Sequence, residues 1–202
     1  MAKLDGTGVS PNKTVICISG LAGTGKSTLA KKLAEKYSLA YYSGGDALKM
    51  LAKQEGYDIS SQGWWESPVG LKFIQERVND PKFDRAVDGK LLEFARQGDV
   101  LLDSWTMPWL LKGGFKIWLE ASFEKRVARV AERDCLSYAE AVKVLEEKEG
   151  HTKAIYKEVY GFALGEDLSP FDFILDTDNL DAIQVFEVLC QVIDKVVLST
   201  SV

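Results

Sequence analysis

The stretch Gly20-Leu21-Ala22-Gly23-Thr24-Gly25-Lys26-Ser27 fits the pattern G-x-x-x-x-G-K-[ST], which is typical of a loop that cradles phosphates. Its glycines let several backbone N–H groups approach a polyphosphate without intervening side chains. Lys26 is expected to contact the β- and γ-phosphates, Ser27 to ligate Mg²⁺, and the following Thr28 to lie near the α-phosphate. The loop therefore predicts a nucleoside triphosphate site.

The residues on either side of this loop match the strand and the helix between which such a loop lies. Residues 14–19 are β-branched and nearly all apolar, as expected for a strand buried on both faces. In residues 27–37, Leu29 and Leu33 fall on one stripe and lysines on another, which indicates a helix. A glycine-rich turn without a ligand is the alternative interpretation, and these flanking elements disfavour it.

Four more apolar β-type runs follow the loop, with helical patterns between them. They lie at residues 39–43, 100–103, 115–119 and 171–176. Alternating strands and helices predict an α/β fold with a parallel sheet and helices on both faces. Ligands of such sheets bind at the carboxyl ends of the strands. Gly20, Asp103 and Glu120 are expected at that edge.

Composition limits the classes of function. The chain has 202 residues, enough for one domain, and its net charge of −5 argues against binding to a nucleic-acid polymer. No run approaches the roughly 18 apolar residues of a membrane span, and the N-terminus lacks a signal-peptide core. Cys17, Cys135 and Cys190 are widely spaced, so they are interpreted as small buried hydrophobes. We expect a cytoplasmic protein without a membrane partner.

Two intervals between the expected strands are longer than a simple crossover. The first predicts an insertion at residues 44–98, with Trp64, Trp65 and a helical stretch at 84–96, which we interpret as the acceptor-binding part. The second contains a charged helical run, and its residues 134–152 are interpreted as a lid. The remaining core comprises residues 13–43, 99–133 and 153–202, and residues 1–12 form a flexible leader. All belong to one expected domain.

The order of these segments resembles the nucleoside monophosphate kinases, and specifically the archaeal-type cytidylate kinase family. The likeness covers roughly residues 15–177. Besides the loop, it is carried by Ser43-Gly44-Gly45-Asp46, by Lys116-Ile117-Trp118-Leu119-Glu120-Ala121, by Arg126-Val127-Ala128-Arg129-Val130-Ala131-Glu132-Arg133, by Tyr156-Lys157-Glu158-Val159-Tyr160-Gly161, and by Asp167-Leu168-Ser169-Pro170-Phe171-Asp172-Phe173-Ile174-Leu175-Asp176-Thr177-Asp178.

This resemblance implies a P-loop NTPase fold of about five parallel strands and transfer of the γ-phosphoryl group of ATP to a small acceptor, CMP or dCMP. The protein would mainly position two substrates and neutralise charge. The resemblance places Asp103 near a metal-bound water and Arg129 and Arg133 beside the donor nucleotide. Arg126 shares their helix face and fits either a phosphate contact or a solvated face with glutamate pairs.

The acceptor side departs from the family. Relatives carry an arginine after the third strand that grips the acceptor phosphate, whereas Trp105 follows Asp103-Ser104 here and cannot make a bidentate phosphate contact. Lys49 supplies a weaker point charge where relatives often have arginine, and lysines replace arginines in the lid. Asp46 is expected either to orient the acceptor or to cap a helix. Asp46, Lys49 and Trp105 are therefore the predicted acceptor-binding residues.

Aromatic residues accumulate where the arginines are missing, and they could stack on a base or a sugar. Trp109 and Trp118 lie in apolar contexts that favour core positions, whereas Trp64 and Trp65 fit either role. His151, the single histidine, is expected to have no catalytic role.

Two other functions stay open from the sequence: a kinase of a non-nucleotide metabolite, and a regulatory or assembly ATPase without acceptor transfer. The sequence leaves open whether the protein is a monomer or a homodimer.

Overall fold

The computed structural model describes residues 13–61, 63–79 and 82–199, so the leader predicted at residues 1–12 lies outside the described residues. Its elements, in chain order, are β1 (Val15–Ser19), α1 (Lys26–Lys36), β2 (Ala40–Ser43), α2 (Gly44–Gln54), η1 (Trp64–Glu66), α3 (Pro68–Asn79), α4 (Lys82–Gln97), β3 (Val100–Asp103), α5 (Met107–Leu110), β4 (Phe115–Glu120), α6 (Phe123–Asp134), α7 (Tyr138–Tyr160), β5 (Phe173–Asp176), α8 (Ala182–Val192) and η2 (Ile193–Leu198).

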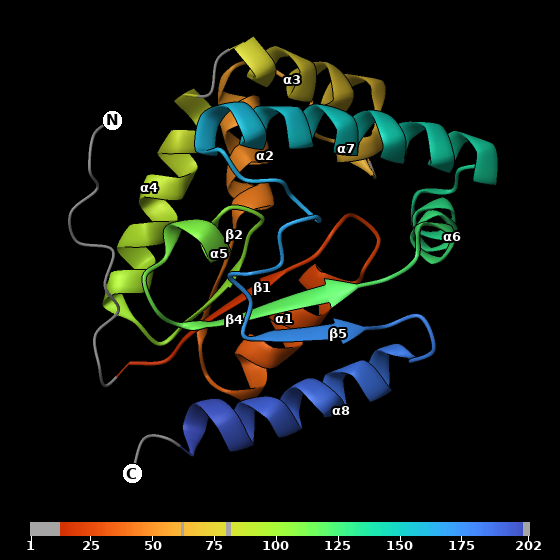
Figure 1. The fold of residues 1–202 in the computed structure, drawn as a ribbon. Coiled ribbons are helices and arrows are strands. Elements are labelled where there is room, and N and C mark those ends of the chain that lie inside the picture. The colour runs from red at the N-terminus through yellow and green to blue at the C-terminus, as the bar shows by residue number, and fades with distance from the viewer. Residues whose placement is uncertain (1–12, 62, 80–81, 200–202) are drawn as a thin grey trace.

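The five strands form one parallel sheet in the order β2-β3-β1-β4-β5, which confirms the expected α/β fold (Figure 1). Asp103, the last residue of β3, is in register with Ile18 of β1 and with Ser43 of β2. The carboxyl ends of these three strands therefore meet at one edge. β5 begins at Phe173, two residues later than predicted, although the N–H of Asp172 already donates to the carbonyl oxygen of Lys116 on β4.

Alternation of side chains along the strands places apolar residues on both faces of the sheet. On one face, Ile16, Ile18 and Leu101 pack with residues of α1 and α8. On the other face, Val15, Cys17 and Leu102 pack with residues of α2, α4 and α5. This arrangement is the expected sandwich of helices around a parallel sheet. Each face of the sheet thus has its own apolar core.

Helices α3 and α7 pack side by side, on the opposite side of the sheet from α8 (Figure 1). α7 begins with a capping box, in which Ser137 and Glu140 satisfy each other's backbone N–H groups, and ends at Gly161, whose φ is 81°. It runs unbroken through the predicted lid boundary at residue 152. The division of the chain into core, insertion and lid stays a prediction.

The cysteines are free, as expected, but only two of them are buried. Cys17 and Cys190 lie in the two cores, whereas Cys135 is exposed and ends α6 with a left-handed φ of 56°. The expectation of burial is therefore wrong for Cys135, which is the C-cap residue of α6. No helix among the described residues combines the length and the apolar character that a membrane crossing requires.

Candidate nucleotide and acceptor site

The phosphate loop joins β1 to α1, as the sequence predicts. A Cβ on Gly20 would lie 2.5 Å from the carbonyl oxygen of Leu119, and one on Gly23 would lie 2.7 Å from that of Arg126. Both contacts are with backbone, so only glycine fits, and φ at Gly23 is +83°. Within the described residues, no side chain caps the N-terminus of α1. Its first N–H groups are therefore free to bind an anion.

Two arginines of α6 donate hydrogen bonds to backbone carbonyl oxygens of the phosphate loop. Arg126 is buried, donates to the carbonyl oxygen of Ala22 at 3.1 Å, and forms an ion pair with Glu149 of α7. The alternative of a solvated face is therefore wrong for Arg126. Arg129 donates to the carbonyl oxygen of Gly23 at 3.4 Å and to that of Thr177, beyond β5, at 3.2 Å. Both guanidinium groups support the loop backbone.

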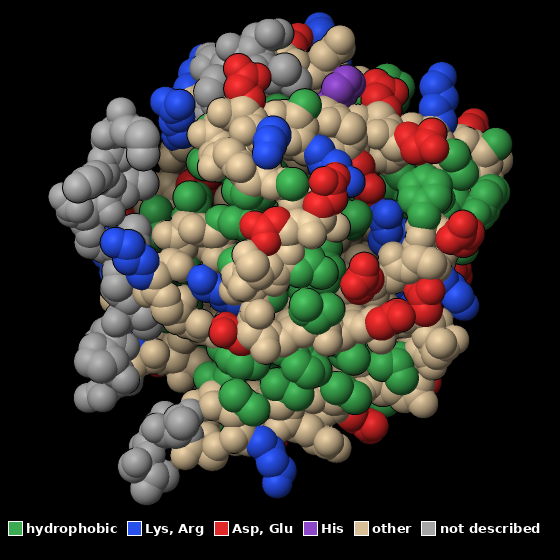
Figure 2. Space-filling model, in the orientation of Figure 1, with side chains coloured by type: hydrophobic (Ala, Val, Ile, Leu, Met, Phe, Trp, Pro, Cys, Tyr) green, Lys and Arg blue, Asp and Glu red, His purple; other side chains and the backbone are tan. Residues whose placement is uncertain are grey.

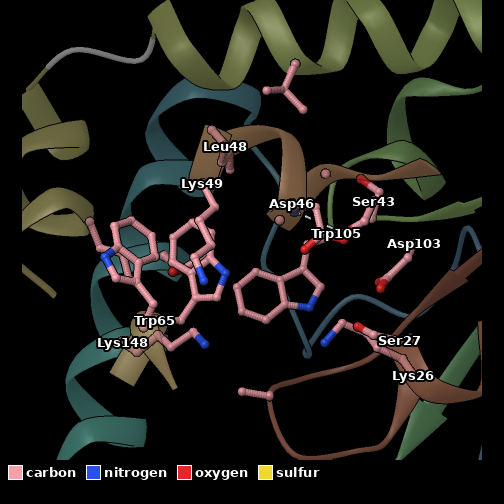
Figure 3. A pocket seen from close by; sticks show the side chains of 18 of the residues that line it. Lys26, Ser27, Ser43, Asp46, Leu48, Lys49, Trp65, Asp103, Trp105 and Lys148 are labelled. Carbon is pink, nitrogen blue, oxygen red and sulfur yellow. Dashed lines mark hydrogen bonds between the residues drawn. The ribbon is translucent and has the colours of Figure 1, made fainter. Parts of the chain in front are cut away.

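A cavity of about 350 Å³ is lined on one side by the phosphate loop. Among the predicted site residues, those that line it are Ala22, Gly23, Lys26, Ser27, Asp46, Lys49, Asp103, Trp105 and Arg133. The others are Gly20, Leu21, Thr24, Gly25, Thr28 and Arg129, which are not among its lining residues. The loop, the predicted acceptor residues and Arg133 of α6 therefore face one space, which Figure 3 shows from close by.

Lys26 lies near charged side chains of both signs that line this cavity. Burial is the main influence on its pKa and lowers it, while the nearby carboxylate of Asp103 acts in the opposite direction. Its ammonium nitrogen lies 5.2 Å from the centre of the Trp105 ring. A bound polyphosphate would add negative charge beside Lys26 and favour its protonated form.

Ser27 and Asp103 are suited to a Mg²⁺ ion. Ser27 is exposed at the start of α1, and Asp103 is buried at the end of β3, where it accepts a hydrogen bond of 3.2 Å from the hydroxyl of Tyr41. Hydroxyl and carboxylate oxygens are the hard ligands that Mg²⁺ prefers, and it usually keeps several waters and substrate phosphates as further ligands. Two oxygen-bearing side chains beside a phosphate loop therefore fit this ion.

Trp105 is fixed by the phosphate loop itself. Its indole N–H donates to the carbonyl oxygen of Gly20 at 2.5 Å, and its ring meets Tyr156 edge-on with ring centres 6.4 Å apart. Figure 3 shows the ring between Lys26 on one side and Lys148 on the other. Because the N–H is already bonded, Trp105 can offer a ligand only its ring surface.

Asp46 and Lys49 line the cavity from α2. Ser43 caps this helix, because its hydroxyl accepts from the backbone N–H of Asp46, so the interpretation of Asp46 as the cap is wrong. Asp46 lies in the first turn, where a carboxylate interacts favourably with the helix dipole. The ammonium nitrogen of Lys49 lies 5.7 Å from the ring centre of Trp64. Both residues thus lie on the cavity wall, and their role toward an acceptor stays a prediction.

Glu66 is a cavity residue that the sequence did not indicate. Its carboxylate is buried and accepts from the ammonium of Lys148 on α7 and, at 3.0 Å, from the guanidinium of Arg133 on α6. Asp134 is a second partner of Arg133, with the guanidinium Nε 2.8 Å from its Oδ1. Of the lysines in the lid, Lys148 is the one that lines the cavity.

A second buried polar group lines the cavity from α3 and α4. Arg77 and Asp84 form a two-point ion pair, and Asp88, one helical turn later, accepts from the hydroxyls of Thr106 and Tyr160. Burial raises the pKa of Asp88 to about 6. The sequence indicates that Asp84 and Asp88 are buried, because they are spaced i, i+4 and lie on the same face of α4 as its apolar residues.

The other tryptophans divide as their contexts suggest. Trp64 is buried and donates to the carbonyl oxygen of Asp58, Trp109 stacks on Phe162, and Trp118 is buried in the core. The core role expected for Trp109 and Trp118 is confirmed. Trp65 is half-buried and lines the cavity, and His151 is not among the lining residues.

Comparison with known proteins gives a consistent relationship across nearly the whole chain. The model of the cytidylate kinase-like family matches residues 15–179. The cytidylate kinase of Methanocaldococcus jannaschii is 34% identical over 186 residues, which cover 90% of this chain and 98% of the relative. The cytidylate kinase of Pyrococcus horikoshii is 33% identical, covering 91% of this chain and 90% of the relative.

Solved structures support the fold. An uncharacterized protein from Eubacterium ventriosum superposes with a TM-score of 0.60 at 17% identity, covering 90% of this chain and 98% of that one. Shikimate kinase from Bacteroides thetaiotaomicron superposes with a TM-score of 0.52 at 13% identity, covering 90% of this chain and 96% of that one. At these identities the likeness concerns the arrangement of strands and helices alone.

Proposed function

The chain belongs to the cytidylate kinase-like family, and from this we propose that it transfers the γ-phosphoryl group of ATP to a nucleoside monophosphate, with CMP or dCMP as the acceptor. The observation that carries the proposal is that one cavity is lined both by the phosphate loop and by the predicted acceptor-binding insertion. Because both substrates could lie in one space, the acceptor oxygen could meet the γ-phosphorus directly.

The donor half of the cavity supports binding of ATP. The loop backbone and the start of α1 offer N–H groups, and Lys26 offers a cation for the β- and γ-phosphates. Ser27 and Asp103 would hold Mg²⁺, which bridges phosphate oxygens and neutralises their charge when it is bound. Arg126 and Arg129 keep the loop in its phosphate-binding shape through the carbonyl oxygens of Ala22 and Gly23.

The distribution of charge supports an anionic acceptor. Three cations that line the cavity are paired with carboxylates, namely Arg77 with Asp84, and both Arg133 and Lys148 with Glu66. Within the part of the chain that the structure describes, Lys26 and Lys49 have no carboxylate at ion-pair distance. We assign Lys26 to the donor phosphates and Lys49 to the acceptor phosphate. Asp46 would then orient the acceptor beside it.

The phosphoryl transfer itself needs positioning and charge neutralisation rather than a covalent enzyme intermediate. The surfaces of Trp65 and Trp105 supply apolar area against which a planar base can stack. Helices α3 and α7 line the cavity through Arg77, Lys148 and Tyr156 and would limit the access of water, which otherwise competes with the acceptor for the phosphoryl group.

Release of ADP from ATP and Mg²⁺, measured with CMP, dCMP, UMP, AMP and GMP in turn, tests this proposal. We expect ADP release with CMP or dCMP, and clearly slower release with the purine nucleotides. Absence of turnover with every nucleoside monophosphate would reject a nucleotide acceptor. In that outcome, turnover in a screen of other metabolites would indicate a different acceptor, and ATP hydrolysis stimulated by a protein would indicate an ATPase.

A further inference from the structure

Glu66 joins three separate elements at the cavity wall, because it lies in η1 and contacts both α6 and α7. Figure 2 shows acidic and basic side chains interspersed on the surface of the molecule. Its carboxylate comes from η1 in the predicted acceptor insertion and bonds Lys148 of α7 through one oxygen and Arg133 of α6 through the other, at 3.0 Å in the second case. The packing here is close, because a Cβ on Gly63 would lie 2.5 Å from the carboxyl carbon of Asp134. A single side chain thus fixes two cations that come from different helices.

The burial of these charges indicates that the arrangement depends on all three partners. The side chains of Glu66 and Lys148 are only 3% and 10% exposed, whereas that of Arg133 is 51% exposed. A buried carboxylate beside an anion site is unfavourable unless cations compensate it. Glu66 has two such partners, so the cluster can retain positive charge toward the cavity. Its two cations would repel each other if the carboxylate were absent.

This cluster acts on the place where the donor phosphates are expected. The charges of Glu66, Lys148 and Arg133 all influence the pKa of Lys26. Figure 3 shows Lys148 and Lys26 directed toward one another from opposite sides of the cavity. An ammonium group carries three N–H donors, and Glu66 receives one from Lys148, so donors remain for a phosphoryl oxygen.

We propose that Glu66 is a positioning residue for phosphoryl transfer, because it holds Lys148 and Arg133 ready to contact the transferred phosphoryl group. The inference rests on the proposed function. Lysine and arginine side chains lose much of their rotamer freedom when they are ordered. Because Glu66 already orders both side chains in the folded protein, the cations need no reordering when the substrates bind. Its effect therefore belongs to kcat more than to the binding of ATP.

The test compares Glu66→Gln, Lys148→Met and the double variant in steady-state kinetics with ATP and CMP. The amide of Glu66→Gln keeps the shape but not the charge. We expect kcat to fall about 10- to 100-fold in each single variant, as for other residues that orient a reacting group. We expect the KM for ATP to stay within about 3-fold of wild type. The double variant should be no slower than about the slower single variant, because Glu66 acts through Lys148.

Two further variants separate positioning from stability. Glu66→Asp keeps the charge with a shorter reach, so its kcat should lie between those of wild type and Glu66→Gln. Glu76→Gln removes the same charge from the same insertion, where Glu76 pairs with Lys72 outside the cavity, and it should keep the wild-type kcat. Thermal unfolding of each variant shows whether the altered kcat belongs to a folded protein.

The possible outcomes are distinct. If wild type turns over CMP and Glu66→Gln keeps or raises kcat, the inference is wrong and the carboxylate competes with the phosphates for its cations. Independent, multiplicative losses in the double variant would also overturn the inference, because Glu66 would then not act through Lys148. If wild type turns over no nucleotide, the proposed function fails first and the inference fails with it.

Discussion

The indole N–H of Trp105 donates a hydrogen bond of 2.5 Å to the carbonyl oxygen of Gly20, the first residue of the phosphate loop. At the position where the sequence predicts the loss of a phosphate-binding arginine, this chain has a side chain that is hydrogen-bonded to its own phosphate loop. The shape of the phosphate loop and the wall of the cavity are therefore linked through one hydrogen bond.

Trp105→Phe should loosen this link. The substitution leaves the carbonyl oxygen of Gly20 without its indole donor, and loss of one such buried bond costs about 1–3 kcal/mol. For a protein of this size we expect a fall in Tm of roughly 2–12 °C, together with a higher KM for ATP. Thermal unfolding and steady-state kinetics provide the measurement. An unchanged Tm and an unchanged KM would show that the bond does not hold the loop.

Lys49→Met should weaken binding of the acceptor while sparing the donor. Removal of the cation assigned to the acceptor phosphate should raise the KM for CMP by about 10-fold or more, which corresponds to at least about 1.4 kcal/mol. The KM for ATP should change by less than about 3-fold. Lys53→Met, an exposed change on the same helix, is the matched control. Equal effects of the two substitutions on the KM for CMP would contradict the assignment of Lys49 to the acceptor phosphate.

Asp88 should make the stability of the folded protein depend on pH. Burial raises its pKa from 3.8 to about 6, although hydrogen bonds from Thr106 and Tyr160 lower it, and Asp84 and Arg77 act on it with opposite signs. The folded state therefore holds this proton more tightly than the unfolded state does. By linkage, the contribution of Asp88 to stability falls as the pH rises from about 4 through about 6.

Asp88→Asn removes this titration. We compare the free energy of unfolding of the variant with that of wild type at two pH values. The difference, variant minus wild type, should be about 1 kcal/mol larger at pH 7 than at pH 5, because one pKa unit corresponds to about 1.4 kcal/mol. The corresponding change in the difference between the two Tm values is roughly 2–4 °C. Thermal unfolding in matched buffers measures it. A Tm difference that is the same at both pH values would contradict the shifted pKa.

Two glycine-to-alanine changes should have opposite effects. In Gly23→Ala, the new methyl group would meet the carbonyl oxygen of Arg126, and φ is +83°, so the loop must distort and ATP binding should be lost. Gly89 lies inside α4, and a Cβ added there would meet no neighbouring atom within 4 Å, so Gly89→Ala should stabilise the helix by about 0.5–1 kcal/mol. Thermal unfolding and ATP titration measure both. Retained ATP affinity in Gly23→Ala would argue against the tight loop geometry.

The fold could be predicted because its signals are local. Buried parallel strands are continuous apolar runs, and the phosphate loop has a fixed spacing of glycines and lysine, so both are visible in short windows of sequence. Asp103 could be predicted because it ends a buried strand. The boundary of the lid could not be placed in the same way, because the helical pattern of α7 continues through residue 152.

The Glu66 cluster could not be predicted because it depends on distant contacts. Glu66 lies 82 positions from Lys148, and its burial follows from how η1 packs against α7. No periodicity in its short segment identifies it as buried. Arg126 was ambiguous for a similar reason, since only the folded chain brings Glu149 and the carbonyl oxygen of Ala22 to its guanidinium. Asp84 and Asp88, in contrast, could have been found from their spacing on the apolar face of α4.

The central claim is that Lys26 and the phosphate loop present ATP to a nucleotide acceptor in the same cavity. The most direct measurement follows transfer of a labelled γ-phosphoryl group from ATP to CMP by wild type and by Lys26→Ala. Among the described residues Lys26 forms no ion pair, so its removal leaves no carboxylate without a partner, and the variant should remain folded, with a Tm close to that of wild type. The account predicts labelled CDP from wild type and none above background from the folded variant; equal transfer by both proteins would contradict it.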